Sequence, residues 1–122
     1  MKLFTHNMLS SKSLEGVKVG YPLRIIAKEI KISESEFNKE FVKKIIGNIN
    51  WKVFVNAAKQ IGYGKDLSEE LIKNYENDEE YLKKVHHLLM EVDIINGELI
   101  CPETHRAFPI SDGVPNLLSD ED

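Results

Sequence analysis

The last part of the chain, from Gly97 onward, constrains the fold more than any other segment. Asn96-Gly97 is the strongest turn signal in the sequence, and short apolar segments follow it. The chain then reaches Val114-Pro115-Asn116-Leu117-Leu118 just before the acidic tail 119–122. Apolar side chains this close to the end of a chain must be covered either by the protein's own core or by another protein. The residues alone leave both possibilities open.

Composition bounds the class of protein. The chain has 122 residues, enough for one core or for two small lobes that share an interface. Apolar residues make up 42% and charged residues 30%, as in soluble globular proteins, and we expect neither a secretory signal nor a membrane span. The single cysteine excludes an internal disulfide framework and favours a reducing compartment. A net charge of −4 argues against autonomous binding to nucleic acid.

Strand patterns occur toward both ends of the chain. Residues 2–9 alternate loosely, which predicts a strand. Residues 23–32 are rich in isoleucine and predict a strand that is buried on both faces for part of its length. Asn96-Gly97 predicts a hairpin between 92–95 and 98–101.

Helix signals fill the middle. Asn38 and Asn50 are positioned to cap two helices that carry apolar stripes, and Asn77 with Glu80 forms a weak capping box before a third. The sequence therefore predicts an α+β fold. A small antiparallel β lobe, formed by both termini (1–33 plus 93–122), holds an inserted helical lobe, 34–92.

Residues that could carry chemistry form no convincing site. His86 and His87 are adjacent, so on a helix they point about 100° apart and cannot chelate one ion from one face; we expect one to be buried and the other to meet solvent. Cys101 and His105 do not have the spacing of a zinc-ligand pair, and His6 is a distant third candidate. Cys101 is best interpreted as a small buried thiol. We therefore predict no catalytic, cofactor-binding or metal-binding residue in this chain.

Three function classes stay open at this point. Pro109 and Pro115 suit an edge position, and an extended apolar edge is suited to strand addition onto a partner. The alternatives are a small hydrolase or transferase that uses Cys101 or the histidines, and a zinc-ribbon-like nucleic-acid-binding or adaptor protein.

The sequence resembles the eukaryotic methyltransferase-activating subunits, small shared partners of several S-adenosylmethionine-dependent methyltransferases. The resemblance is carried by segments 1–11 (MKLFTHNMLSS), 86–91 (HHLLME), 97–103 (GELICPE) and 108–118 (FPISDGVPNLL). Some members have a four-cysteine zinc site in a zinc-ribbon-like lobe. Here Cys101 stands alone, with Ser10 and Ser11 in the N-terminal loop and Thr104 in place of a second cysteine, so the chain resembles the metal-free branch.

The resemblance implies a non-catalytic subunit that forms heterodimers with methyltransferases acting on tRNA, rRNA and a translation termination factor, in the cytoplasm and nucleus. S-adenosylmethionine would be bound by the partner, and nucleic acid would be reached only through it. Leu99, Ile100 and Leu118 would hold the β lobe together. The residues implied to contact the partner are Thr5, Asn7, Met8, Phe108, Ile110, Gly113, Val114, Pro115, Asn116 and Leu117.

Overall fold

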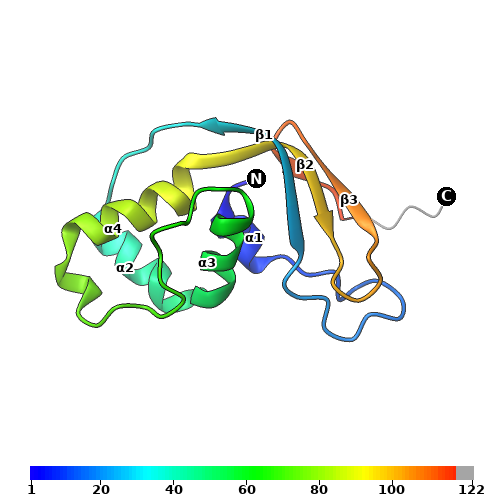
Figure 1. Cartoon of the computed structure of the whole chain (residues 1–122), viewed down its shortest axis with the longest axis horizontal. Coiled ribbons are helices and arrows are strands. Elements are labelled where there is room, and N and C mark those ends of the chain that lie inside the picture. The colour runs from blue at the N-terminus through cyan, green and yellow to red at the C-terminus, as the bar shows by residue number, and fades with distance from the viewer. Residues whose placement is uncertain (118–122) are drawn as a thin grey trace.

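The computed structural model describes residues 1–117, within which helices gather at one end of a four-stranded antiparallel sheet (Figure 1). The strand order is β1-β2-β3-β4, and each strand pairs with its neighbour in antiparallel orientation. The predicted α+β class is confirmed. The elements are α1 (Leu3–Met8), β1 (Arg24–Ile32), α2 (Lys39–Asn48), α3 (Trp51–Gln60), η1 (Tyr75–Asn77), α4 (Glu79–His86), η2 (His87–Glu91), β2 (Val92–Ile100), β3 (Ala107–Ser111) and β4 (Val114–Pro115).

The strand predicted over 2–9 is wrong, because this segment forms helix α1. Leu3, His6 and Asn7 are the buried residues of the helix, and their spacing of three and four places them on one helical face. Eight residues are too few to separate that spacing from loose alternation. Lys2 alone keeps a strand-like pairing, as an isolated bridge to Asp93.

The hairpin predicted at Asn96-Gly97 is also wrong. Both residues lie inside β2, which pairs with β1 on one side and β3 on the other. A Cβ atom on Gly97 would collide with the carbonyl oxygen of Ile26, next to the register shift that follows Ala27. The glycine therefore permits a close backbone approach at a bulge rather than a turn. The real connection between β2 and β3 is the 101–106 turn, which the Cys101 N–H closes by donating to the Arg106 carbonyl over 2.9 Å.

The strand predicted over 23–32 is confirmed as β1, but it is not buried on both faces. Ile25 is buried, whereas Ile26 and Ile32 are 39% and 46% exposed. β1 belongs to an antiparallel sheet, in which one face can pack on the core while the other meets solvent, so its apolar composition does not require burial on two faces.

The N-cap residues predicted the starts of the helices more accurately than apolar patterns predicted the strands. Asn38 Oδ1 accepts the Phe41 N–H over 3.0 Å, and Asn50 Oδ1 accepts the Val53 N–H over 3.2 Å, which confirms both predicted caps. The third helix begins one residue later than predicted, because Asp78 and not Asn77 caps α4. After α4 the chain makes the π-helical turn η2 and enters β2 at Val92.

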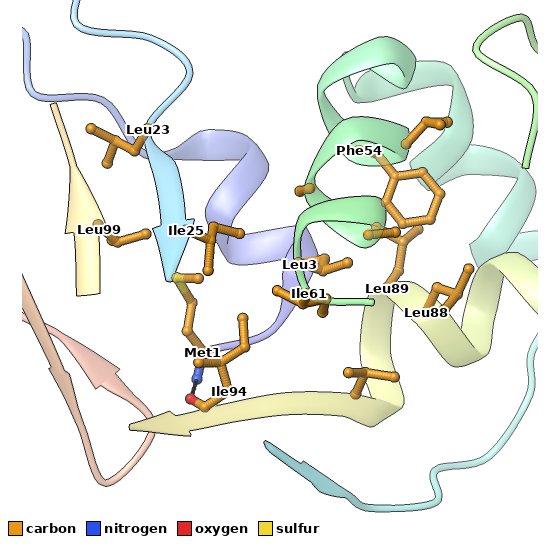
Figure 2. Packing of buried hydrophobic residues seen from close by; sticks show 14 of the residues in the cluster. Met1, Leu3, Leu23, Ile25, Phe54, Ile61, Leu88, Leu89, Ile94 and Leu99 are labelled. Atoms are coloured by element: carbon orange, nitrogen blue, oxygen red, sulfur yellow. Dashed lines mark hydrogen bonds between the residues drawn. The ribbon is translucent and has the colours of Figure 1, made fainter. Parts of the chain in front are cut away.

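One cluster of buried side chains joins the sheet to the helices. Figure 2 shows Ile25 and Leu99 from the strands near Leu3 of α1, with Phe54 of α3 and Leu89 of η2 further along the same cluster. Leu99 is completely buried and Ile100 is half-buried, while the predicted role of Leu118 falls outside the described residues. The division into lobes at 33–34 and 92–93 stays a prediction.

Candidate functional site

A shallow groove of about 600 Å³ runs along the C-terminal edge of the sheet. It is lined by Val114, Pro115, Asn116 and Leu117 on one side and by residues of the 9–13 loop, Leu9, Ser10 and Ser13, on the other. Val114 is 64% exposed, the highest exposure among the large apolar residues of the described chain. Because β4 is an edge strand of two residues that pairs only with β3 within residues 1–117, an apolar surface and an open backbone edge coincide here.

Helix α1 extends the apolar surface toward the groove. Thr5 and Met8 are both exposed, Met8 by 54%, and their separation of three places them on one side of the helix. Met8 precedes the groove residue Leu9 directly. Because α1 is helical, Thr5 and Met8 face away from Asn7, which a strand would have placed beside Thr5.

Asn7 faces inward and joins α1 to α3. Its Nδ2 donates to the Asn50 carbonyl over 2.9 Å, and its Oδ1 accepts the Asn50 N–H over 3.0 Å. Asn50 is also the N-cap of α3. The side chain is 4% exposed, so in this chain it fixes the position of α1.

Three other predicted contact residues support the edge from inside. Phe108 and Ile110 are each 2% exposed and belong to the buried face of β3. Gly113 has a φ of 79° and donates its N–H to the Ile95 carbonyl over 2.9 Å. Of the ten residues, Val114, Pro115, Asn116 and Leu117 therefore meet in the groove, with Thr5 and Met8 on the exposed side of α1. The contact role of all ten stays a prediction.

An ammonium group that the sequence did not suggest holds the turn before β4. The Met1 α-amino group donates to Asp93 Oδ1 over 2.7 Å, to the Ile94 carbonyl over 2.6 Å and to the Gly113 carbonyl over 2.7 Å. This contact fixes the β3–β4 turn against β2. The part of the groove wall that residues 9–13 form was not predicted either, because Ser10 and Ser13 are polar residues typical of a connecting loop.

The same loop is tied to the β2–β3 turn by hydrogen bonds. Ser11 Oγ donates to Cys101 Sγ over 3.0 Å, and the Glu103 carboxylate accepts the N–H groups of Lys18, Val19 and Gly20 over 2.7 to 2.9 Å. These N–H groups, of which that of Lys18 has the largest effect, hold the pKa of Glu103 below its usual range. The 9–22 segment is thereby held beside the sheet without any metal ligand.

Cys101 is buried, as predicted. Burial acts to raise the pKa of its thiol, but hydrogen bonds from Ser11 and Thr104 outweigh it and lower the pKa to about 7. Ser11 and Thr104 supply hydroxyl groups, which do not make a tetrahedral zinc site with one thiolate. No group of three or more His, Cys, Asp or Glu side chains within residues 1–117 could hold a metal ion.

The histidines make internal contacts. His86 is buried and His87 is partly exposed, as predicted, and both lie against Glu91, at 3.4 Å and 2.7 Å. The hydrogen bond from the Ser35 N–H has the largest effect on the Glu91 carboxylate and that from His87 the next largest, and together they hold its pKa below the usual range. His6 is buried with Nε2 2.7 Å from the Leu23 carbonyl, and this burial lowers its pKa. These contacts brace segments of the chain against one another.

Comparison with known proteins places the sequence among close relatives. The family model described as "Trm112p-like protein" matches residues 2–113. The chain is 48% identical to the mouse multifunctional methyltransferase subunit TRM112-like protein over 124 aligned residues, which cover 100% of this chain and 98% of the relative. It is 44% identical to the Arabidopsis thaliana multifunctional methyltransferase subunit TRM112 homolog A, with the same coverage.

A solved structure has the same fold. It belongs to the E. cuniculi Mtq2-Trm112 complex, described as responsible for methylation of the eRF1 translation termination factor. The TM-score is 0.57 at 20% identity, and the match covers 98% of this chain and 96% of that one. Among the described residues, no helix combines the length and the apolar character needed to cross a membrane.

Proposed function

This chain belongs to the Trm112p-like family, and from that membership we propose that it is a non-catalytic subunit that activates and stabilises S-adenosylmethionine-dependent methyltransferases. The observation that carries the proposal is the full-length identity of 48% to a relative named as a multifunctional methyltransferase subunit. The partners are methyltransferases of tRNA, rRNA and the translation termination factor. The subunit works in the cytoplasm and the nucleus.

The groove and its surroundings are the proposed docking site. Val114 and Leu117 offer apolar surface beside an open strand edge, and α1 adds Met8. A methyltransferase strand or loop placed along β4 would cover these side chains. The partner in turn would gain stability in proportion to RT ln(1 + [L]/Kd), about 2.7 kcal/mol at a free subunit concentration 100 times Kd.

The proposed division of labour leaves the chemistry to the partner. The buried thiol of Cys101 and the contacts of His6, His86 and His87 serve the packing of the chain. From the family membership we propose that S-adenosylmethionine is bound by the partner and that nucleic acid is reached only through the partner. Isothermal titration of the purified chain with S-adenosylmethionine should give no binding heat, and elemental analysis should find no zinc.

The test is affinity purification of the tagged chain from its own cells, followed by mass spectrometry. We expect several methyltransferases, each in a one-to-one complex. Val114→Asp should lose them, whereas Phe41→Asp, an apolar-to-acid change at a position 47% exposed in α2, should retain them. Absence of any methyltransferase from the wild-type sample would overturn the proposal.

A further inference from the structure

The sheet has a second, mainly apolar surface, which we call the outer face: Arg24, Ile26, Glu98, Ile100, Ala107, Pro109, Ser111 and Val114. Residues that pair across antiparallel strands share a face. The register pairs Ile26 with Glu98 and Glu98 with Pro109, and it pairs Ile100 with Ala107. Ser111, which is two residues after Pro109, pairs with Val114. The outer face therefore draws side chains from all four strands.

The two faces of the sheet differ in burial. Ile25, Leu99 and Phe108, which alternate with the outer residues along their strands, are buried in the core. On the outer face Ile26 and Val114 are 39% and 64% exposed, Ala107 and Pro109 are exposed, and Ile100 is half-buried. In Figure 1 the strands that carry these residues lie side by side, with helices α2 and α4 at the far end of the molecule. Single exposed apolar residues are normal on a protein surface, whereas a contiguous apolar face that crosses a whole sheet indicates an interaction site.

Glu98 lies in the middle of this surface, between Ile26 and Pro109. It is half-buried and makes no ion pair or side-chain hydrogen bond within residues 1–117. A partner that covered its apolar neighbours would remove water from the carboxylate, so it would have to supply a cation or an N–H donor.

This charge argues against two occupants from the chain itself. A second copy carries a net charge of −4 and would bring its own Glu98 to this face, with Arg24 on the edge strand β1 as the basic side chain among the outer-face residues. The sequence of the C-terminal tail, Ser119-Asp120-Glu121-Asp122, is acidic as well. A different protein with a basic or N–H-bearing apolar surface suits the face better.

The area that a stable complex must bury indicates that one partner covers both the groove and the outer face. Specific complexes bury about 800 Å² on each partner, with roughly 20–30 residues a side. The groove has seven lining residues, and β4 is two residues long. Val114 belongs to both the groove and the outer face, so the two surfaces are continuous.

We propose that the bound methyltransferase covers the outer face as well as the groove, reaching Ile26 on β1 and placing a Lys or Arg side chain, or a backbone N–H, against Glu98. This inference rests on the proposed function. It extends the docking surface from one edge of the sheet to the strand at its opposite edge.

β1 supplies a matched pair of variants. Ile26 and Ile32 have similar exposure on one strand, but the bulge between them separates their environments: Ile32 pairs with Val92, which is completely buried on the core side. The affinity of each purified variant for the methyltransferase recovered with the wild-type chain is measured by biolayer interferometry. We expect Ile26→Asp to raise Kd about tenfold or more, because it would place a second carboxylate beside Glu98 on the covered surface, and Ile32→Asp to leave Kd within about twofold. Glu98→Lys should raise Kd as well.

A second variant guards against misfolding. Ala107→Arg adds bulk and charge to the outer face without removing any buried side chain, and circular dichroism of each free chain checks its folding. Loss of affinity in Ile26→Asp and Ala107→Arg, with Ile32→Asp unaffected, supports the inference. If both outer-face variants bind normally while Val114→Asp does not, the outer face is not part of the interface, although the proposed function stands. A wild-type chain that is a dimer in solution and becomes monomeric on Ile26→Asp would assign the face to a second copy and overturn the inference. If the wild-type chain retains no methyltransferase, the proposed function fails first.

Discussion

The Oγ atom of Ser11 lies 3.0 Å from the Sγ atom of Cys101, which connects the N-terminal loop to the end of β2 across ninety residues of sequence. Neither residue can hold zinc without further ligands. Their hydrogen bond nevertheless joins the N-terminal loop to the turn that follows β2. Together with the Glu103 carboxylate it fixes the 9–22 segment, and with it the wall of the docking groove.

The Cys101 thiol makes stability depend on pH. Hydrogen bonds lower its pKa to about 7 from an ordinary value of 9.0. A group with a depressed folded pKa contributes stability that is present above its unfolded pKa and lost as the pH falls through the folded pKa. The free energy of unfolding should therefore rise between about pH 7 and 9, by about 1–3 kcal/mol relative to Cys101→Ala.

Ser11→Ala separates this effect from other titrating groups. Without the hydroxyl donor the pKa of Cys101 should move back up, and the difference in pH dependence from Cys101→Ala should shrink. Thermal unfolding and the ultraviolet absorbance of the thiolate, each followed against pH, give the two readouts. An unchanged thiolate titration in Ser11→Ala would contradict the assignment.

Glu103 should control the order of the loop that it holds. Its pKa is depressed by three backbone N–H groups, so this contribution to stability is present at neutral pH and is lost as the pH falls below about 4.5 and through the lower folded pKa. In Glu103→Ala we expect faster hydrogen exchange at the amides of Lys18, Val19 and Gly20, measured by NMR. Glu15→Ala, an exposed position in the same segment, should leave those rates unchanged. Equal exchange in the two variants would show that the carboxylate does not fix the loop.

Gly97 and Gly47 should respond to alanine in opposite directions. A methyl group on Gly97 would meet the Ile26 carbonyl, so Gly97→Ala should destabilise the chain by about 1–3 kcal/mol through overpacking. Gly47 lies in α2 with open space around its Cα, so Gly47→Ala should stabilise it by about 0.5–1 kcal/mol. Urea unfolding measures both. Tolerance of alanine at Gly97 would show that the Ile26 carbonyl leaves room for a side chain at this position.

The two glycines show which features the sequence could predict. Capping by Asn38 and Asn50 depends on residues three positions away, and both caps were predicted correctly. The role of Gly97 depends on the carbonyl of Ile26, which lies far away in the sequence, and no local pattern carries that information. Asn-Gly has a strong preference for turns, and tertiary pairing of β2 overrode it.

The candidate site was predicted in part for the same reason. Val114, Pro115, Asn116 and Leu117 are consecutive, and their edge position followed from two prolines. The groove's other wall and the Met1 ammonium contact come from the opposite end of the chain, so they needed the fold. The short segment α1 was wrongly predicted as a strand because the spacing of its apolar residues fits either a helix or a loosely alternating strand.

Asn7 and Met8, neighbours in α1, should separate stability from docking. Asn7→Ala removes both hydrogen bonds to the Asn50 backbone. The Asn50 carbonyl keeps the Phe54 N–H as a donor, but the Asn50 N–H loses its acceptor, so the free energy of unfolding should fall by about 1–3 kcal/mol. Asn7→Asp keeps an acceptor for the Asn50 N–H but turns a carboxylate oxygen toward the Asn50 carbonyl at a position only 4% exposed, so it should destabilise the chain at least as much as Asn7→Ala. Met8 is 54% exposed, so Met8→Asp should leave thermal unfolding nearly unchanged and weaken methyltransferase binding. Measuring both quantities for each variant decides the roles: a stable Asn7→Ala chain that fails to bind would return Asn7 to the contact surface, and a Met8→Asp chain that binds normally would remove α1 from it.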